Sequence, residues 1–176
     1  ALARNKRDAD ALGGLGLVDL KRGRFAQARD QLAQASQLGD ASKWKEALES
    51  ARYFASLQEA QAMVTRGALD DARKAAEALI RSGYAENGGA YELLADIYER
   101  QGRFADAADL YRQAGGEDSP NGQRLQSRAA RGAALSAAAR GDDFGAEQAF
   151  QQGIMLDQSD PWIRYEFARF MIRRGR

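Results

Sequence analysis

Large apolar and small side chains recur along this chain at the spacing of amphipathic helices. In one stretch, four of them share a helical face at i, i+3, i+4 and i+7: Tyr91, Leu94, Ala95 and Tyr98. After a turn at Gly102, a second face is formed by Phe104, Ala107, Ala108, Tyr111 and Ala114. The pattern predicts two short helices over residues 88–121, and the alanines allow their backbones to approach closely.

The same helix pair is repeated along the chain. A period of about 34 residues with this spacing of large and small side chains is typical of the tetratricopeptide repeat, whose helix pairs must pack on their neighbours. We therefore predict an all-α, right-handed superhelical solenoid. The predicted copies occupy residues 9–42, 53–86, 88–121, 127–160 and, in part, 161–176. Each copy has a glycine where its two helices should turn: Gly23, Gly67, Gly102, Gly141 and Gly175.

The first and second copies are further apart than the period allows. Gly67 follows Gly23 by 44 residues, so about ten extra residues lie at 43–52. This insertion is expected to form an added helical segment or to extend the next helix. It should change the local curvature of the array or act as a hinge.

Two further features of the first 60 residues are unusual for the repeat. Trp44, Tyr53 and Phe54 lie around the insertion, and we expect them in a local core instead of a ligand site. Asp19 stands where the repeat usually has an aromatic side chain, which predicts weaker packing there.

The partial copy at 161–176 has only its first helix, so we expect the chain to be a fragment of a longer repeat protein.

Composition excludes several classes of function. The 176 residues include 26 basic and 25 acidic side chains, so no strong field attracts nucleic acid. The sequence has no Cys and no His, which removes disulfides, thiol nucleophiles, imidazole catalysis and the usual zinc sites. No apolar run approaches the roughly 20 residues that span a bilayer, so direct membrane insertion is not expected.

Paired carboxylates are the one hint of catalysis. Asp142 and Asp143 could suggest a glycosidase, because two acids carry out that chemistry. However, adjacent side chains cannot flank a bond from opposite sides, and acids at a turn cap the following helix. We predict no enzyme activity, no cofactor and no metal site.

The first helices of such an array line a concave groove, and two sets of side chains are candidates for it. Glu92, Asp96 and Glu99 form an acidic stripe, suited to a basic or hydroxyl-rich ligand. The alternative is a solvated helix face whose acids pair with Arg100 and Arg103.

The second set lies in the fifth copy and combines aromatic rings with arginines: Trp162, Tyr165, Arg169 and Arg173. Such a set is suited to stacking on sugars or to anchoring a peptide. The alternative is that this helix packs on a second helix that the sequence does not include.

Two segments resemble a known family. One is Ala9–Ala35 with the inserted Asp40-Ala-Ser-Lys-Trp44, and the other is Asp160-Pro-Trp-Ile-Arg-Tyr165. Both are similar to the periplasmic tetratricopeptide-repeat region of the bacterial cellulose synthase operon protein C family, the outer-membrane export component. The resemblance implies a periplasmic location, with the full-length protein anchored in the outer membrane.

The resemblance also implies a function. It indicates a non-catalytic scaffold for cellulose synthesis and export, with proteins of the synthase complex, the glucan chain or peptidoglycan as partners. One alternative is a cytosolic peptide-binding adaptor of the co-chaperone type. Such adaptors clamp a carboxylate with Lys and Asn, but the equivalent positions here are Gly13 and Leu17. A third hypothesis is direct glucan binding through Trp162 and Tyr165.

Overall fold

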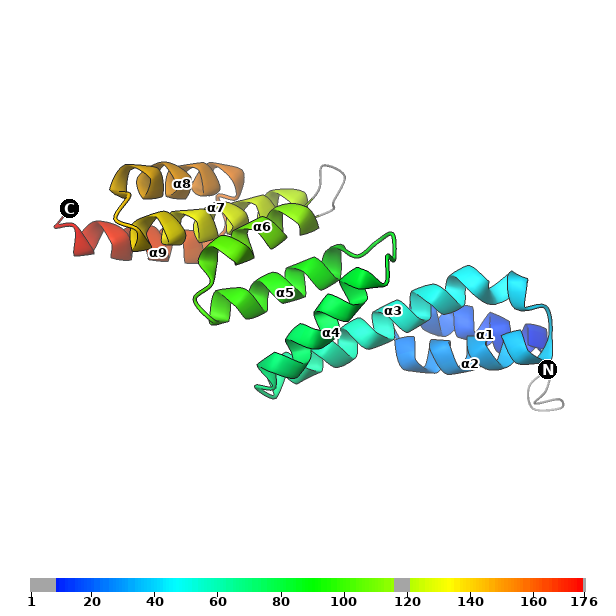
Figure 1. Ribbon diagram of the computed structural model, residues 1–176. Coiled ribbons are helices and arrows are strands. Elements are labelled where there is room, and N and C mark those ends of the chain that lie inside the picture. The colour runs from blue at the N-terminus through cyan, green and yellow to red at the C-terminus, as the bar shows by residue number, and fades with distance from the viewer. Residues whose placement is uncertain (1–8, 116–120, 176) are drawn as a thin grey trace. The chain divides into compact units, whose positions relative to one another are not determined.

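The computed structural model describes residues 9–115 and 121–175, and every regular element in these ranges is an α-helix (Figure 1). The ends predicted for the third and fifth copies, residues 116–120 and 176, lie outside the described residues. None of the described helices has the length and apolarity needed to cross a membrane. The helices are α1 (Ala9–Lys21), α2 (Phe25–Leu38), α3 (Ala41–Thr65), α4 (Leu69–Arg81), α5 (Gly88–Arg100), α6 (Phe104–Ala114), α7 (Gly122–Ala139), α8 (Asp143–Leu156) and α9 (Pro161–Arg173).

The turn glycines confirm the period that the sequence predicts. Gly23, Gly67, Gly102, Gly141 and Gly175 have φ values of 72°, 80°, 73°, 79° and 70°. This left-handed conformation is strained for side chains with a Cβ atom and is open to glycine. Gly23, Gly67, Gly102 and Gly141 each lie in the turn between the two helices of a copy, and Gly175 follows α9, the first helix of the partial copy. The all-α tetratricopeptide-repeat fold is therefore confirmed.

The chain divides into two compact units, residues 1–62 and 63–176. The core of the first unit joins α1, α2 and the first half of α3: Leu12, Ala28, Leu32, Ala35, Trp44, Leu48 and Ala51. Trp44 is only 5% exposed, and Tyr53 is also buried. The ring of Phe54 stacks on Phe25 with 5.1 Å between centroids. The three aromatic residues around the insertion thus belong to a local core, as expected.

The inserted residues do not form a separate element. Residues 43–52 lie within α3, a single helix of 25 residues. The insertion therefore extends the next helix, which was one of the two alternatives. A hinge at this place stays a prediction.

Asp19 is buried in the first unit in place of the usual aromatic. It is 4% exposed, and Nε of Arg24 donates a hydrogen bond of 2.9 Å to its Oδ1. This hydrogen bond lowers the pKa of the Asp19 carboxyl, and a second one from the Gln31 side chain acts in the same direction. An ion pair thus fills the position, because a buried carboxylate needs such partners.

The second unit contains two apolar clusters. The first joins α5, α6 and α7: Ala95, Ala107, Tyr111, Ala114, Leu125 and Ala129. The second joins α7, α8 and α9: Ala134, Ala137, Ala146, Phe150, Ile163 and Phe170. Small residues allow the helices to approach closely: at Gly132 an added Cβ would lie 2.9 Å from the carbonyl oxygen of Phe104.

The side chain of Asp142 caps α8 by accepting a hydrogen bond from the backbone N–H of Gly145, as predicted for an acid at this turn.

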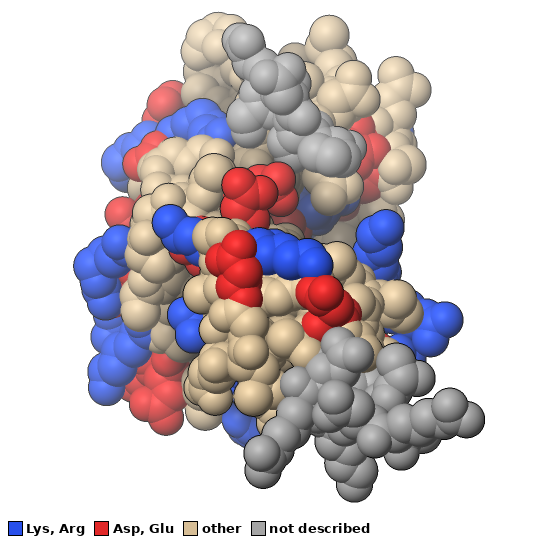
Figure 2. Space-filling view, turned by 90° about the vertical axis from the view of Figure 1, so that its right-hand side faces the viewer, with Lys and Arg blue, Asp and Glu red and all other residues tan. Residues whose placement is uncertain are grey.

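Surface charge is mixed. On the face shown in Figure 2, acidic and basic side chains lie beside one another. This agrees with the net charge of +1.

Candidate functional site

The second unit has a groove with a volume of about 1310 Å³, lined by residues of α5, α7 and α9, by Phe104 at the start of α6 and by the turn between α8 and α9. These three helices are the first helices of successive copies, so the groove lies where the repeat architecture predicts it. Five of the seven predicted site residues line it: Asp96, Glu99, Trp162, Arg169 and Arg173. Glu92 and Tyr165 are not among its lining residues.

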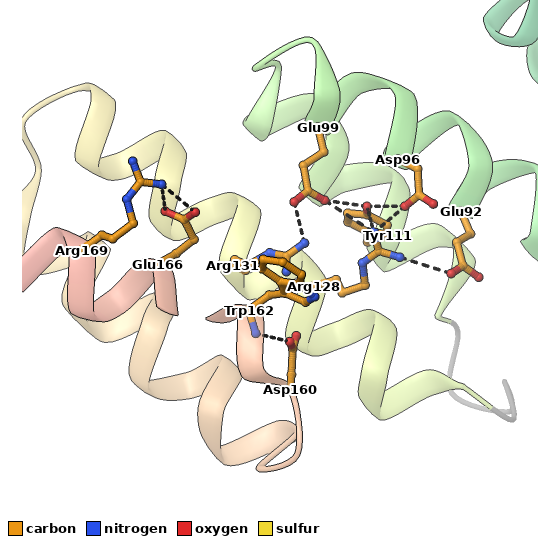
Figure 3. Close-up of polar contacts among 10 residues, drawn as sticks. All are labelled: Glu92, Asp96, Glu99, Tyr111, Arg128, Arg131, Asp160, Trp162, Glu166 and Arg169. Atoms are coloured by element: carbon orange, nitrogen blue, oxygen red, sulfur yellow. Dashed lines mark hydrogen bonds and ion pairs between the residues drawn. The ribbon is translucent and has the colours of Figure 1, made fainter. Parts of the chain in front are cut away.

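The acidic stripe on α5 faces arginines on α7 (Figure 3). Nη2 of Arg124 lies 2.8 Å from Oε1 of Glu92, and Nη2 of Arg131 lies 2.5 Å from Oε1 of Glu99. Between them, Nη2 of Arg128 lies 2.5 Å from Oδ1 of Asp96. We call these six residues the ion-pair ladder. Its three carboxylates and three guanidinium groups balance in charge.

Tyr111 of α6 lies at the centre of the ladder. The residue is fully buried, and its Oη lies 2.6 Å from Oδ1 of Asp96 and 2.7 Å from Oε2 of Glu99. A phenol has one proton, so the two carboxylates share one donor. Nη2 of Arg128 donates to the same oxygen at 2.5 Å, and its guanidinium lies over the ring at 4.3 Å. Burial and the nearby Asp96 raise the pKa of the Tyr111 hydroxyl.

The alternative interpretation, in which the stripe pairs with Arg100 and Arg103, named the wrong arginines. Arg103 bonds to Asp106 at 2.7 Å and stacks on the ring of Tyr98. The partners of the stripe come from the next copy because first helices of successive copies lie side by side. Sequence analysis missed Arg124, Arg128 and Arg131, although their signal was present: they repeat the spacing of Glu92, Asp96 and Glu99 after 32 residues.

Two aromatic side chains of α9 are accessible, and one of them, Trp162, lines the groove. Trp162 is 63% exposed and Tyr165 is 53% exposed, and their rings meet edge to face at 6.3 Å. Arg169 lies over the Tyr165 ring at 5.4 Å, and its Nη1 lies 3.1 Å from Oε1 of Glu166. Asp160 begins the helix by accepting a hydrogen bond of 2.8 Å from the backbone N–H of Trp162. Trp162 thus lies at the start of α9 with most of its surface available for contact.

The lining of this groove combines guanidinium groups, carboxylates and one large accessible ring. Within the described residues, no group of three or more carboxylates is placed to hold a metal ion.

Comparison with known proteins agrees with this fold. A family model described as tetratricopeptide repeat matches residues 57–122. The chain is 33% identical to cellulose synthase operon protein C of Xanthomonas axonopodis pv. citri (strain 306) over 97% of its length. It is 26% identical over 99% of its length to the protein of the same name from Pseudomonas fluorescens (strain SBW25). It is also 32% identical, over 96% of its length, to cellulose synthase 2 operon protein C of Komagataeibacter xylinus.

The chain spans only 14% of the Xanthomonas relative and 16% of each of the other two. The resemblance noted in the sequence is nevertheless confirmed, because the similarity covers nearly all of this chain in three relatives that share the name. The chain therefore has the tetratricopeptide-repeat fold and is homologous to a part of cellulose synthase operon protein C.

Proposed function

We propose that the chain is a non-catalytic interaction module that organises the machinery of bacterial cellulose synthesis and export. It acts in the periplasm, in a protein anchored in the outer membrane. Its partners are proteins of the synthase and secretion complex, and the glucan chain or peptidoglycan is a further class of partner. The observation that carries the proposal is the similarity over 97% of the chain to cellulose synthase operon protein C.

The groove of the second unit supports a role in binding. It is lined mostly by polar side chains, and several of them, including Arg128 and Arg131, are already fixed by ion pairs. Fixed side chains lose little conformational freedom when a partner binds. The cytosolic adaptor is less well supported, because Gly13 packs against the Trp44 ring and has no side chain to clamp a carboxylate.

Photo-cross-linking in cellulose-producing cells tests the proposal. A photoreactive amino acid replaces Trp162, which lines the groove, in the protein as the cells make it. A matched control carries the same amino acid at Phe144, which is 73% exposed on α8 and does not line the groove. We expect Trp162 to cross-link to cellulose synthase or secretion proteins, and Phe144 to do so much less. Recovery of cytosolic chaperones alone would refute the proposal.

A further inference from the structure

The outward side of α8 carries two of the most exposed large apolar side chains in the described part of the chain. Phe144 is 73% exposed, and Met155 is 78% exposed. The buried side of this helix includes Ala146 and Phe150, which pack in the cluster with α7 and α9. At 3.6 residues per turn, Phe144 and Met155 lie on the opposite side of the helix from these two. The core of the second unit therefore leaves this side of α8 uncovered, at the edge of the unit in Figure 1.

Three glutamines share this side of the helix, and all three are exposed: Gln148, Gln151 and Gln152. None of the three carries a charge. Nε2 of Gln151 donates a long hydrogen bond of 3.5 Å to Oε1 of Glu147. An amide has two N–H donors and an accepting oxygen, so this bond uses only one of its groups. We call the two apolar residues and the three glutamines together the α8 outer face.

The second helices of the other copies carry charges at the equivalent positions. Each of α2, α4, α6 and α8 begins two residues after its turn glycine, which fixes the correspondence. The equivalents of Phe144, Gln148, Gln151 and Met155 in α4 are all charged: Asp70, Lys74, Glu77 and Arg81. In α6 they include Asp109 and Arg112, and in α2 they include Asp30. An exposed surface that has lost its charges and gained large apolar side chains is typical of a contact with another protein.

The α8 outer face is also symmetric along the helix. Phe144 and Met155 lie equally far from its midpoint, and so do Gln148 and Gln151. If two copies of α8 pack antiparallel about a twofold axis through this midpoint, each Phe144 faces Met155 of the second copy. Each Gln148 then faces Gln151 of the second copy. A methionine sulfur packs favourably on an aromatic ring, and two amides can donate to and accept from one another.

We propose that the α8 outer face binds the same face of a second copy of this chain, in an antiparallel pair with twofold symmetry. Five side chains from each copy are fewer than the about 20–30 residues a side of a stable interface. The pairing is therefore weak, with half of the chains paired only above about 10 µM.

This pairing goes beyond the proposed function. The residues of α8 do not line the groove, so a paired chain keeps its groove accessible on each copy. Two grooves in one pair allow a partner complex with two matching sites to bind with avidity.

Sedimentation equilibrium of the purified chain tests the pairing. From about 5 to about 500 µM, the average mass should rise from that of one chain and level off at that of two, because a twofold contact closes on itself. Raising the salt from about 50 to about 500 mM should not weaken the association, since the α8 outer face has no charge to screen. A mass that stays at one chain, or an association that salt dissolves, would overturn the inference.

One substitution locates the contact. Phe144→Glu places a carboxylate in the contact twice, once from each copy, and should weaken the association at least about tenfold. The matched control is Ile172→Glu, because Ile172 is also 73% exposed but lies on α9. Both variants should keep the helical circular dichroism of the parent protein, since the changed side chains are exposed. Unchanged association of Phe144→Glu, or an equal loss in both variants, would refute the proposed contact.

Engineered cysteines test the antiparallel direction independently. The sequence has no Cys, so a disulfide can form only between introduced residues. Chains with Phe144→Cys are mixed with size-tagged chains that carry Met155→Cys and are oxidised by dissolved oxygen. The antiparallel pair brings these two cysteines together, so mixed disulfides should predominate. Two Phe144→Cys chains place their cysteines about 16 Å apart along the helices, too far for a disulfide. Like-with-like disulfides as abundant as mixed ones would argue for a different arrangement and against the proposal.

The pairing and the proposed function fail separately. In cells, a photoreactive amino acid at Phe144 should join two copies of the chain, whereas Trp162 should join the chain to other synthase or secretion proteins. Capture of a different protein at Phe144 would refute the pairing and leave the role of the groove unaffected. Capture of a second copy at Phe144 with only cytosolic chaperones at Trp162 would support the pairing and refute the proposed function.

Discussion

Removing the Tyr111 hydroxyl measures what its hydrogen bonds to the ion-pair ladder contribute to stability. Tyr111→Phe keeps the buried ring and deletes only the oxygen that Asp96, Glu99 and Arg128 contact. A hydrogen bond to a charged group contributes ~1.5–3 kcal/mol. The hydroxyl has one proton to donate, and both carboxylates keep an arginine partner after the change. We therefore expect the free energy of unfolding of the second unit to fall by about 2 kcal/mol, the value for one hydrogen bond to a charged group and not the sum over all three contacts.

The assay is urea unfolding followed by circular dichroism, with amide hydrogen exchange to locate the change. Protection should fall in α5, α6 and α7, while α1 and α2 of the first unit keep theirs, because stability in repeat proteins is largely local. Tyr165→Phe is the control, since this tyrosine is 53% exposed, and its loss should stay below about 0.5 kcal/mol. If Tyr111→Phe costs no more than the control, the hydroxyl does not hold the ladder together.

The same residue predicts how stability depends on alkaline pH. The folded protein raises the pKa of the Tyr111 hydroxyl above its ordinary value of 10.0, chiefly through burial. Its contribution is complete below pH 10 and is lost as pH rises further, because the unfolded chain then ionises first. Tyr111→Phe should reduce this loss, and identical alkaline profiles for the two proteins would contradict the reasoning.

Two further substitutions test the packing of each unit. Gly132→Ala places a Cβ 2.9 Å from the Phe104 carbonyl oxygen, so it should destabilise the second unit by about 1–3 kcal/mol in urea unfolding. The control is Gly14→Ala, which is also within a helix but has open space around the new Cβ. It should raise the free energy of unfolding by about 0.5–1 kcal/mol. Asp19→Asn tests the buried ion pair: the lowered pKa of Asp19 means that its stabilisation is present above about pH 4 and lost as pH falls below it. The variant should therefore show a flatter acid dependence in thermal unfolding than the parent protein, and an unchanged profile would count against the pair.

Much of the fold could be predicted from the sequence because the same positions recur in every copy of the repeat. Each copy needs one turn glycine, and five glycines occur at the place that the pattern of small and large residues predicts. Asp19 could not be understood in this way. The repeat pattern states which side chain usually fills that position, whereas the partner that permits a carboxylate, Arg24, is identified only by the folded structure.

The groove was only partly predictable for a different reason. Sequence analysis placed Asp96 and Trp162 on first helices, and the structure brings both to one groove. Partners of the acids were sought within one helix, where residues three or four apart meet. In a solenoid the nearest neighbour of a first helix is the equivalent helix of the next copy. Pairing had to be sought one repeat away, as Glu92 and Arg124 demonstrate.

The ladder has a consequence for how related chains can diverge. Glu92, Asp96 and Glu99 each face an arginine that lies 32 residues later in the sequence. Loss of one charge leaves the other without a counter-charge in a half-buried site, which is destabilising. A single change at one position is therefore disfavoured, whereas a reversal of both charges keeps the pair. Among relatives, substitutions at two positions 32 residues apart should therefore be correlated, so that neighbouring copies of the repeat change together.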